Sequence, residues 1–371
     1  LHVSISADAK LVGESTLARI LDMFEHQAQS LAAMCQALDT SVPPAPIDFV
    51  EPDWDLDAYL SLLDANGIER SEVSNIVPIT AMQSGLIFHA RSKPADLAYL
   101  EQVDFTLQGV EADKLAHAFQ RLLVEFPLLR AEFIVGDNGR TAQLIRSSVD
   151  LPIVAHDLGE LAPKEQQRLI DKAREEDQAR QFDIRQAPLM RVQLFTLHNA
   201  KPKRKPKAGQ RSSVHIIWTH HHLIMDGWCV GILFERLLAL YAEQASEGLD
   251  LAEPRERLNH DYFQWLATRD RRATAAYWST LLAGVELPTR LLPWPSADAS
   301  KDLSKDSGYR LKRHEVQIPA ALTANMKAWG ASRSATLSSI IRLTWGVLLA
   351  KFTNSSDVVY GTVVSGRPAE I

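Results

Sequence analysis

One stretch decides the fold: residues 214–228, which read VHIIWTHHHLIMDGW. Its first half is largely apolar and alternating, which predicts a buried strand. Gly227 allows a close backbone turn, and Asp226 suits the start of a helix, where a carboxylate caps free N–H groups and complements the helix dipole. Apolar residues then recur at helical spacing, at Val230, Leu233, Phe234, Leu237, Leu238 and Tyr241. The stretch therefore predicts a strand, a tight turn and a helix.

The histidines in this stretch are the candidate chemistry. A histidine at the end of a buried strand, held by a carboxylate at the helix start, suits a general base or a proton-positioning group. The plainer alternative is a buried histidine pair that ends a core strand. A zinc site is a third hypothesis. Successive strand residues point to opposite faces, so His220, His221 and His222 cannot converge on a metal without a turn.

Residues 221–227, HHLIMDG, match the pattern HHxxxDG. They resemble the signature of the superfamily that includes chloramphenicol acetyltransferase and the condensation domains of non-ribosomal peptide synthetases. Other segments resemble further condensation-domain motifs, in the same order along the chain. They are residues 76–86 (IVPITAMQSGL), 125–133 (EFPLLRAEF), 260–265 (HDYFQW), 277–284 (YWSTLLAG) and 357–368 (DVVYGTVVSGRP). The last of these resembles the C-lobe strand of the family that ends in Ser-Gly-Arg-Pro, so a strand is expected there. One departure is Phe126-Pro127, where the family has a His-Glu pair.

The resemblance implies an α/β fold, the two-lobed chloramphenicol-acetyltransferase-like sandwich with its active site between the lobes. Residues 75–250 are expected to form a complete N-lobe that carries HHxxxDG. Residues 251–371 are expected to form a truncated C-lobe, since the family's later motifs do not follow Ser-Gly-Arg-Pro. Residues 41–74 read as a proline-rich linker and a short helix. Residues 1–40 resemble the tail of a preceding synthetase domain, and a helical linker is the alternative.

By resemblance, the chain is an acyltransferase-type enzyme that forms peptide bonds. An acceptor amine attacks a donor thioester, and both substrates arrive on the phosphopantetheine arms of carrier proteins. His222 would be the catalytic histidine, as a base or as a hydrogen-bond donor to the intermediate. His221 would point away and pack, Gly227 would offer a backbone N–H, and Trp228 would line the core or tunnel. The alternatives are an epimerisation domain, which shares the signature, and a non-catalytic recruitment domain of the same fold.

Supporting residues follow from the same motifs. Asp226 is expected to form a buried ion pair with Arg130, placed on the strand after the helix 113–126. Ser365, Gly366 and Arg367 would shape the tunnel from the C-lobe. The expected partners are upstream and downstream carrier domains and an adjacent adenylation domain. The domain itself is expected to bind no cofactor and no metal. The character of the motifs suggests a fungal synthetase.

Composition excludes several other classes. Of 371 residues, 46% are hydrophobic and 23% charged, as in ordinary soluble proteins. A net charge of −6 argues against a nucleic-acid binder. No apolar run reaches the length of a membrane span, and no signal peptide opens the chain. The cysteines, Cys35 and Cys229, offer neither a disulfide framework nor metal-ligand spacing. A cytoplasmic setting is expected.

Overall fold

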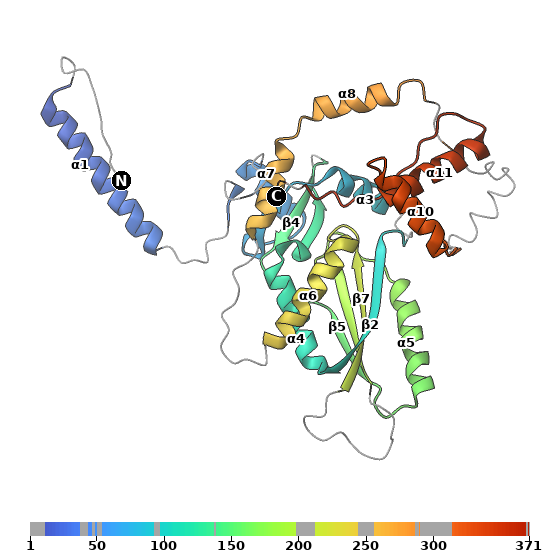
Figure 1. Cartoon of the computed structure of the whole chain (residues 1–371). Helices are drawn as coiled ribbons and strands as arrows, with labels where there is room; N and C mark the ends of the chain where they lie inside the picture. Colours follow the sequence, from blue (N-terminus) through green and yellow to red (C-terminus); the bar gives the residue numbers. More distant parts are fainter. Residues whose placement is uncertain are drawn as a thin grey trace.

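The computed structural model describes residues 12–37, 44–46, 49, 54–92, 97–136, 139–197, 212–243, 256–285, 289, 314–368 and 370. Within these residues the chain combines two sheets with helices on their faces (Figure 1). The predicted α/β fold is confirmed.

The larger sheet carries the histidine stretch. Its strand order is β2-β7-β6-β5, with β2 Leu100–Val110, β7 Ser212–His221, β6 Met190–Leu197 and β5 Ile153–Asp157. β2 and β6 flank β7 in antiparallel pairing, and β5 runs parallel to β6. The predicted strand, turn and helix are confirmed, because β7 ends at His221 and α6 (Gly227–Glu243) begins at Gly227.

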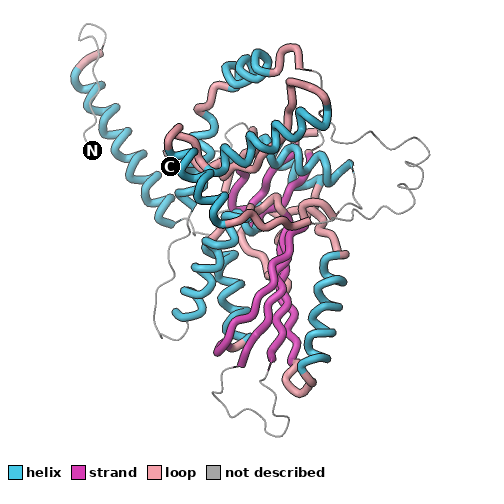
Figure 2. The backbone as a smooth tube through the Cα atoms, turned by 45° about the vertical axis from the view of Figure 1, so that its right-hand side comes forward, coloured by secondary structure: helices cyan, strands magenta, loops and turns pink. Residues whose placement is uncertain are grey.

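Helices cover both faces of this sheet (Figures 1 and 2). Val214, Ile216 and Trp218 of β7 share one core with α4 (Ala112–Glu125) and α6. Ile217 of the same strand packs in a separate cluster with α5 (Pro163–Gln178). The alternation arises because successive strand side chains point to opposite faces. Both faces of β7 are therefore buried, which explains its largely apolar sequence.

A buried polar cluster ties α5 to three strands of this sheet. The Asp177 carboxylate lies 2.6 Å from Arg191 Nε on β6, and it accepts hydrogen bonds from Thr219 of β7 and, at 3.1 Å, from Gln102 of β2. Asp177, Arg191 and Thr219 are all buried. Buried charges are tolerated when they are paired and hydrogen-bonded, as here. The cluster therefore connects the start of β2 with the end of β7, next to the histidine turn.

The smaller sheet has the order β1-β4-β3, all antiparallel, with β1 Val73–Val77, β4 Thr141–Arg146 and β3 Ala131–Val135. Helix α2 (Leu56–Ala65) packs against it, with Tyr59, Leu62 and Leu63 buried. Asp55 caps α2 by accepting a 2.7 Å hydrogen bond from the Ala58 N–H. The short helix predicted after the proline-rich segment is thus part of a packed core.

The structure has six further helices and two short 3-10 turns in the described residues. They are α1 Glu14–Ala37, α3 Ala81–Ser92, α7 Glu256–Ala267, α8 Arg271–Leu281, α10 Ala320–Ala331 and α11 Leu337–Thr353, together with the short 3-10 turns η2 Arg70–Glu72 and η3 Pro127–Arg130. Figure 1 shows α1 apart from both sheets, and its side chains Met23, Phe24, Leu31 and Met34 are exposed. Among the described helices none is both long and apolar enough to cross a bilayer.

One predicted strand is wrong. Residues 357–368 run without helix or strand structure, although their sequence resembles the family's strand that ends in Ser-Gly-Arg-Pro. An extended segment becomes a strand only through hydrogen bonds to a neighbour. No strand pairs with this segment in the described part of the chain, and Val363 is 91% exposed.

Candidate active site

The backbone of the histidine turn is anchored on both sides. The His221 N–H donates to the Leu189 carbonyl at 2.9 Å, and the His222 N–H donates to the Tyr99 carbonyl at 2.8 Å. Tyr99 adopts a positive φ of 75°, which directs its carbonyl into this contact just before β2 begins. His222 is the first residue beyond β7, and its backbone is held by Tyr99, the residue that precedes β2.

Two histidines meet one carboxylate at this end of the sheet. His222 Nδ1 lies 3.0 Å from Glu101 Oε1, and His220 Nε2 lies 3.3 Å from Glu101 Oε2. Glu101 pairs with His220 across β2 and β7. The His220 side chain is completely buried, whereas the His222 side chain is 30% exposed. Of these two rings, only that of His222 is accessible to a reactant.

The electrostatics of the three groups differ. The Glu101 carboxylate raises the pKa of His222, against burial, which lowers it, while Asp226 gives a smaller upward effect. Contact with His220 and His222 holds the pKa of Glu101 well below its usual range. Burial lowers the pKa of His221 to about 4. His221 is therefore neutral near pH 7, and its Nδ1 accepts a 3.1 Å hydrogen bond from the Leu223 N–H.

Asp226 begins α6 and faces a guanidinium. Its Oδ1 accepts a 3.0 Å hydrogen bond from the Cys229 N–H, which confirms the predicted cap. Arg367 contacts both carboxylate oxygens at 3.2 Å, and its Nη2 lies 3.4 Å from Cys229 Sγ. Burial alone would raise the pKa of Asp226, but hydrogen bonds from Arg367 and Cys229 outweigh it and lower that pKa.

The predicted ion pair between Arg130 and Asp226 is wrong. Arg130 lies in η3 and not on a strand, and it is buried. Its Nε donates to the Arg146 carbonyl at 2.8 Å, and its Nη1 donates to the carbonyls of Leu123 and Val124. The last carbonyls of a helix lack partners within the helix, so a nearby guanidinium satisfies them. Arg130 therefore closes the end of α4, and Arg367 takes the place beside Asp226.

Helix α3 reaches the histidine turn through one side chain. Thr80 and Gln83 form a reciprocal cap: Thr80 Oγ1 accepts from the Gln83 N–H at 3.2 Å, and Gln83 Oε1 accepts from the Thr80 N–H at 3.0 Å. Gln83 Nε2 also donates to the Leu223 carbonyl at 3.0 Å. The Thr-x-x-Gln spacing is the signal of such a cap. It does not reveal the contact with Leu223, which is 140 residues away.

Glu101 is the site residue that sequence reasoning missed. Nothing in the local sequence marks it, because its relation to His220 and His222 depends on the pairing register of two strands that lie far apart along the chain. The register is visible only in the folded sheet. Predicting this contact would have required knowing that β2 and β7 are neighbours in the sheet.

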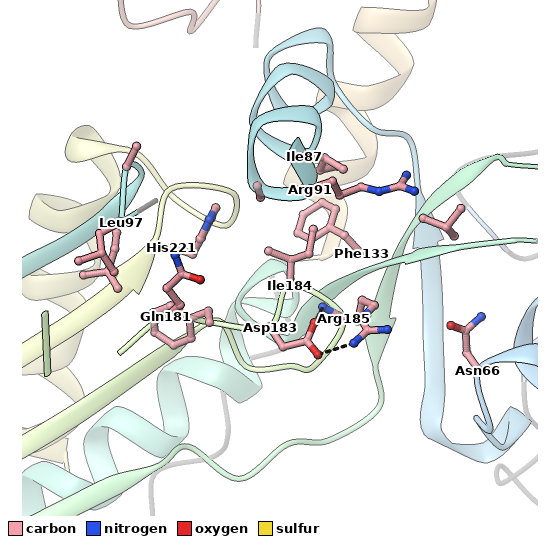
Figure 3. A pocket seen from close by; sticks show the side chains of 15 residues that line it. Asn66, Ile87, Arg91, Leu97, Phe133, Gln181, Asp183, Ile184, Arg185 and His221 are labelled. Carbon is pink, nitrogen blue, oxygen red and sulfur yellow. Dashed lines mark hydrogen bonds and ion pairs between the residues drawn. The ribbon is translucent and has the colours of Figure 1, made fainter. Parts of the chain in front are cut away.

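A cavity of about 660 Å³ opens beside His221 (Figure 3). Its wall includes His221 but not His222. Ile87, Phe133 and Ile184 form an apolar part of the lining, and Asp183 and Arg185 are joined by an ion pair at its edge. His222 therefore contacts Glu101, whereas His221 borders this cavity, and the roles predicted for the two histidines stay predictions.

The other predicted site residues have mixed positions. Gly227 and Trp228 are exposed at the start of α6. Arg367 reaches the site through its contact with Asp226. The Ser365 carbonyl lies 3.4 Å from Arg367 Nη1. Gly366 has a φ of +63°, a conformation that glycine adopts freely. The roles predicted for Gly227, Trp228, Ser365 and Gly366 stay predictions. In the described residues no group of histidine, cysteine and carboxylate side chains is arranged to hold a metal ion.

Comparison with known families gives the class. The Condensation domain family model matches residues 73–370. The chain therefore belongs to the condensation domain family.

Two curated relatives are peptide synthetases. The chain is 30% identical over 302 residues to one of the linear gramicidin synthase proteins of Brevibacillus parabrevis, covering 81% of this chain and 6% of that protein. It is 28% identical over 385 residues to bacitracin synthase 1 of Bacillus licheniformis, covering 100% of this chain and 7% of that protein. The chain thus spans a small fraction of the relatives it matches. Both are bacterial, so the fungal origin is not confirmed.

Solved structures share the fold. The starter condensation domain of rhizomide synthetase RzmA superposes with a TM-score of 0.52 at 20% identity, covering 79% of this chain and 64% of that one. Holo-AB3403, a four-domain nonribosomal peptide synthetase bound to AMP and glycine, superposes with a TM-score of 0.55 at 19% identity, covering 76% of this chain and 20% of that one. The predicted condensation-domain fold is confirmed.

Proposed function

We propose that this chain forms an amide bond between a donor acyl or peptidyl thioester and the amine of an acceptor aminoacyl thioester, both held on carrier proteins. The observation that carries the proposal is His222, half-buried in its HHxxxDG signature and held by a backbone hydrogen bond to Tyr99 and a side-chain contact with Glu101 of β2. Membership of the condensation domain family supports it.

In the proposed reaction, His222 carries a proton from the attacking amine to the leaving thiolate. The acceptor nitrogen attacks the donor carbonyl carbon, and a C–N bond forms while the carbonyl oxygen takes negative charge. His222 Nε2 takes the proton lost by nitrogen. The tetrahedral intermediate then collapses, the C–S bond breaks, and the departing thiolate receives the proton from His222. A thioester is already activated, so positioning of two tethered substrates supplies much of the acceleration.

A second role for His222 is compatible with the same geometry. A protonated Nε2 would donate a hydrogen bond to the oxyanion of the intermediate. The two roles differ in their dependence on pH. A base must be neutral, so the rate falls below the pKa of His222, whereas a cationic hydrogen-bond donor loses activity above it.

Partners and cofactors follow from the proposal. Carrier proteins loaded on both sides would bring the substrates, and an adenylation domain would supply the acceptor amino acid. The phosphopantetheine arms belong to the carriers, so the chain itself would bind no cofactor and no metal. Elemental analysis of active protein is expected to find no stoichiometric zinc.

The experiment identifies products by mass spectrometry and chiral analysis after the chain is mixed with two loaded carrier proteins. Amide product with wild-type chain, and its loss in His222→Ala, is the expected result. His117→Ala, an exposed histidine on α4, is the matched control and should retain full activity. Racemised donor without amide would establish the epimerisation alternative, and no turnover of either kind would favour a non-catalytic recruitment domain.

A further inference from the structure

Glu101 occupies a position that the known motifs of the chain do not explain. It is the second residue of β2, opposite His220 of β7, and its two carboxylate oxygens face different histidines. Oε1 lies 3.0 Å from His222 Nδ1 and Oε2 lies 3.3 Å from His220 Nε2. His220 precedes the HHxxxDG signature, so neither Glu101 nor His220 belongs to it.

We propose that Glu101 is a positioning residue that fixes the ring orientation and the tautomer of His222, and that buried His220 holds Glu101 in place. This inference rests on the proposed function. Glu101 does not touch the reacting atoms; it acts through the imidazole.

The physical argument starts from the two ring nitrogens of His222. A carboxylate accepts hydrogen bonds and cannot donate when ionised, so the nitrogen facing Glu101 is the one that carries hydrogen. Nδ1–H toward Glu101 leaves the lone pair on Nε2, the nitrogen on the opposite side of the ring. A general base oriented by a third group through its second nitrogen is a recurrent arrangement in nucleophilic catalysis.

His220 gives the arrangement rigidity. Its side chain is fully buried at the end of β7, whereas the Glu101 side chain is 40% exposed. A half-exposed glutamate without a second contact would sample several rotamers. The His220 ring lies 3.3 Å from one carboxylate oxygen, and the other oxygen lies 3.0 Å from His222. His220 faces Glu101 from the end of β7 and His222 faces it from the turn that follows, so a single carboxylate reaches both.

The other polar and titratable groups around His222 contact other partners. Asp226, in the same turn, raises the pKa of His222 more weakly than Glu101 does, and its carboxylate is engaged by Arg367. His221, on β7, is neutral because burial lowers its pKa to about 4. From α3, uncharged Gln83 contacts the turn at the Leu223 carbonyl. Glu101 is therefore the carboxylate that acts directly on the imidazole.

The test uses the full chain with Glu101→Gln, which keeps the shape of the side chain and removes its charge. The matched control is Asp104→Asn, the same change three residues further along β2, where the carboxylate pairs with Arg174 of α5. Histidines labelled with carbon-13 are followed by NMR titration, with His222 assigned by its absence in His222→Gln. Amide formation between loaded carriers is measured as kcat against pH.

The expected result has two parts. The NMR pKa of His222 falls by about one unit or more in Glu101→Gln, because an opposite charge at this distance favours the protonated ring. In the same variant kcat falls at least about tenfold, and its acid limb moves to lower pH with the histidine. Glu101→Asp, which keeps the charge but shortens the side chain, recovers some of the lost kcat, and Asp104→Asn matches the wild type.

An unchanged His222 titration together with an unchanged pH profile in Glu101→Gln would overturn the inference. So would a loss of activity with the same pKa and the same profile, because a merely structural role predicts that combination. The NMR measurement does not depend on the reaction, so a failure of the proposed function, seen as no amide with wild-type chain, is separate from a failure of this inference.

Discussion

Arg367 and Asp226 lie 141 residues apart in the sequence and meet at the start of α6, where Nη1 and Nη2 of the guanidinium each lie 3.2 Å from a carboxylate oxygen. This pair joins the segment after α11 to the histidine turn. Its side chains are 43% and 39% exposed, so the contact lies at the surface of the site and not in the core. The Ser-Gly-Arg-Pro segment is therefore tied to the signature through its arginine.

The exposure of this pair predicts a small effect on stability. A solvent-exposed ion pair contributes about 0–1 kcal/mol. We expect Arg367→Ala to lower the free energy of unfolding by no more than about 1 kcal/mol, and a double-mutant cycle with Asp226→Asn to show weak coupling in urea denaturation. Arg168→Ala, which breaks an exposed pair on α5, is the control. A loss above about 3 kcal/mol would show that the pair is buried in solution.

Arg130 should behave in the opposite way. Its guanidinium is buried against three backbone carbonyls, so Arg130→Ala leaves buried acceptors without donors. The expected loss in the free energy of unfolding is roughly 2–4 kcal/mol, because each unsatisfied buried group costs about 1–3 kcal/mol. Combined with Asp226→Asn, the effect should add within about 0.5 kcal/mol. Strong coupling between these two substitutions would contradict the structure, because it would indicate an ion pair between Arg130 and Asp226.

Gln83 offers a way to separate a helix cap from a contact with the site. In Gln83→Glu the side chain still has an oxygen for the Thr80 N–H, but it loses the N–H that donates to the Leu223 carbonyl. We expect this substitution to reduce amide formation about tenfold or more, since the turn that carries His222 is released. Thr80→Ala, which removes the capping hydroxyl and keeps the Gln83 side-chain N–H, should cost about 1 kcal/mol in stability and leave the rate close to that of the wild type. Equal rates in the two variants would contradict a role for the Leu223 contact.

The Glu101–His222 contact predicts a defined pH window for stability. The pKa of His222 is raised in the folded chain, so its stabilising effect is complete below its ordinary value of 6.5 and is lost as pH rises through the raised value. The pKa of Glu101 is lowered, so its effect is present above 4.5 and lost in acid. Wild-type chain should therefore exceed Glu101→Gln in melting temperature most clearly between these two values. A difference that grows above about pH 8 would contradict this sign.

Sequence patterns predicted the elements around the site because those elements have local causes. The apolar alternation of residues 214–219 and the helical spacing from Val230 to Tyr241 both reflect burial against neighbours, and β7 and α6 formed as expected. The Asp226 cap was also local, since its partner is three residues away.

The errors concern contacts between distant segments. The choice between Arg130 and Arg367 as the partner of Asp226 depends on which guanidinium the fold brings near, and Arg130 is engaged by the carbonyls that end α4. The strand expected at residues 357–368 failed for the same reason, because a strand requires a partner that local sequence does not specify. Local sequence does not reveal the role of Glu101, because only the register of β2 against β7 brings it to His222.

The most direct test of the central claim is a single-turnover measurement of amide formation, with saturating chain and two preloaded carrier proteins, for wild type and His222→Gln. Single turnover removes carrier exchange and product release from the rate. The account predicts that His222→Gln is slower by about 10²–10⁴-fold, the range for a positioned acid–base group, with circular dichroism and melting temperature preserved. Amide formation at the wild-type rate in a folded His222→Gln chain would contradict it.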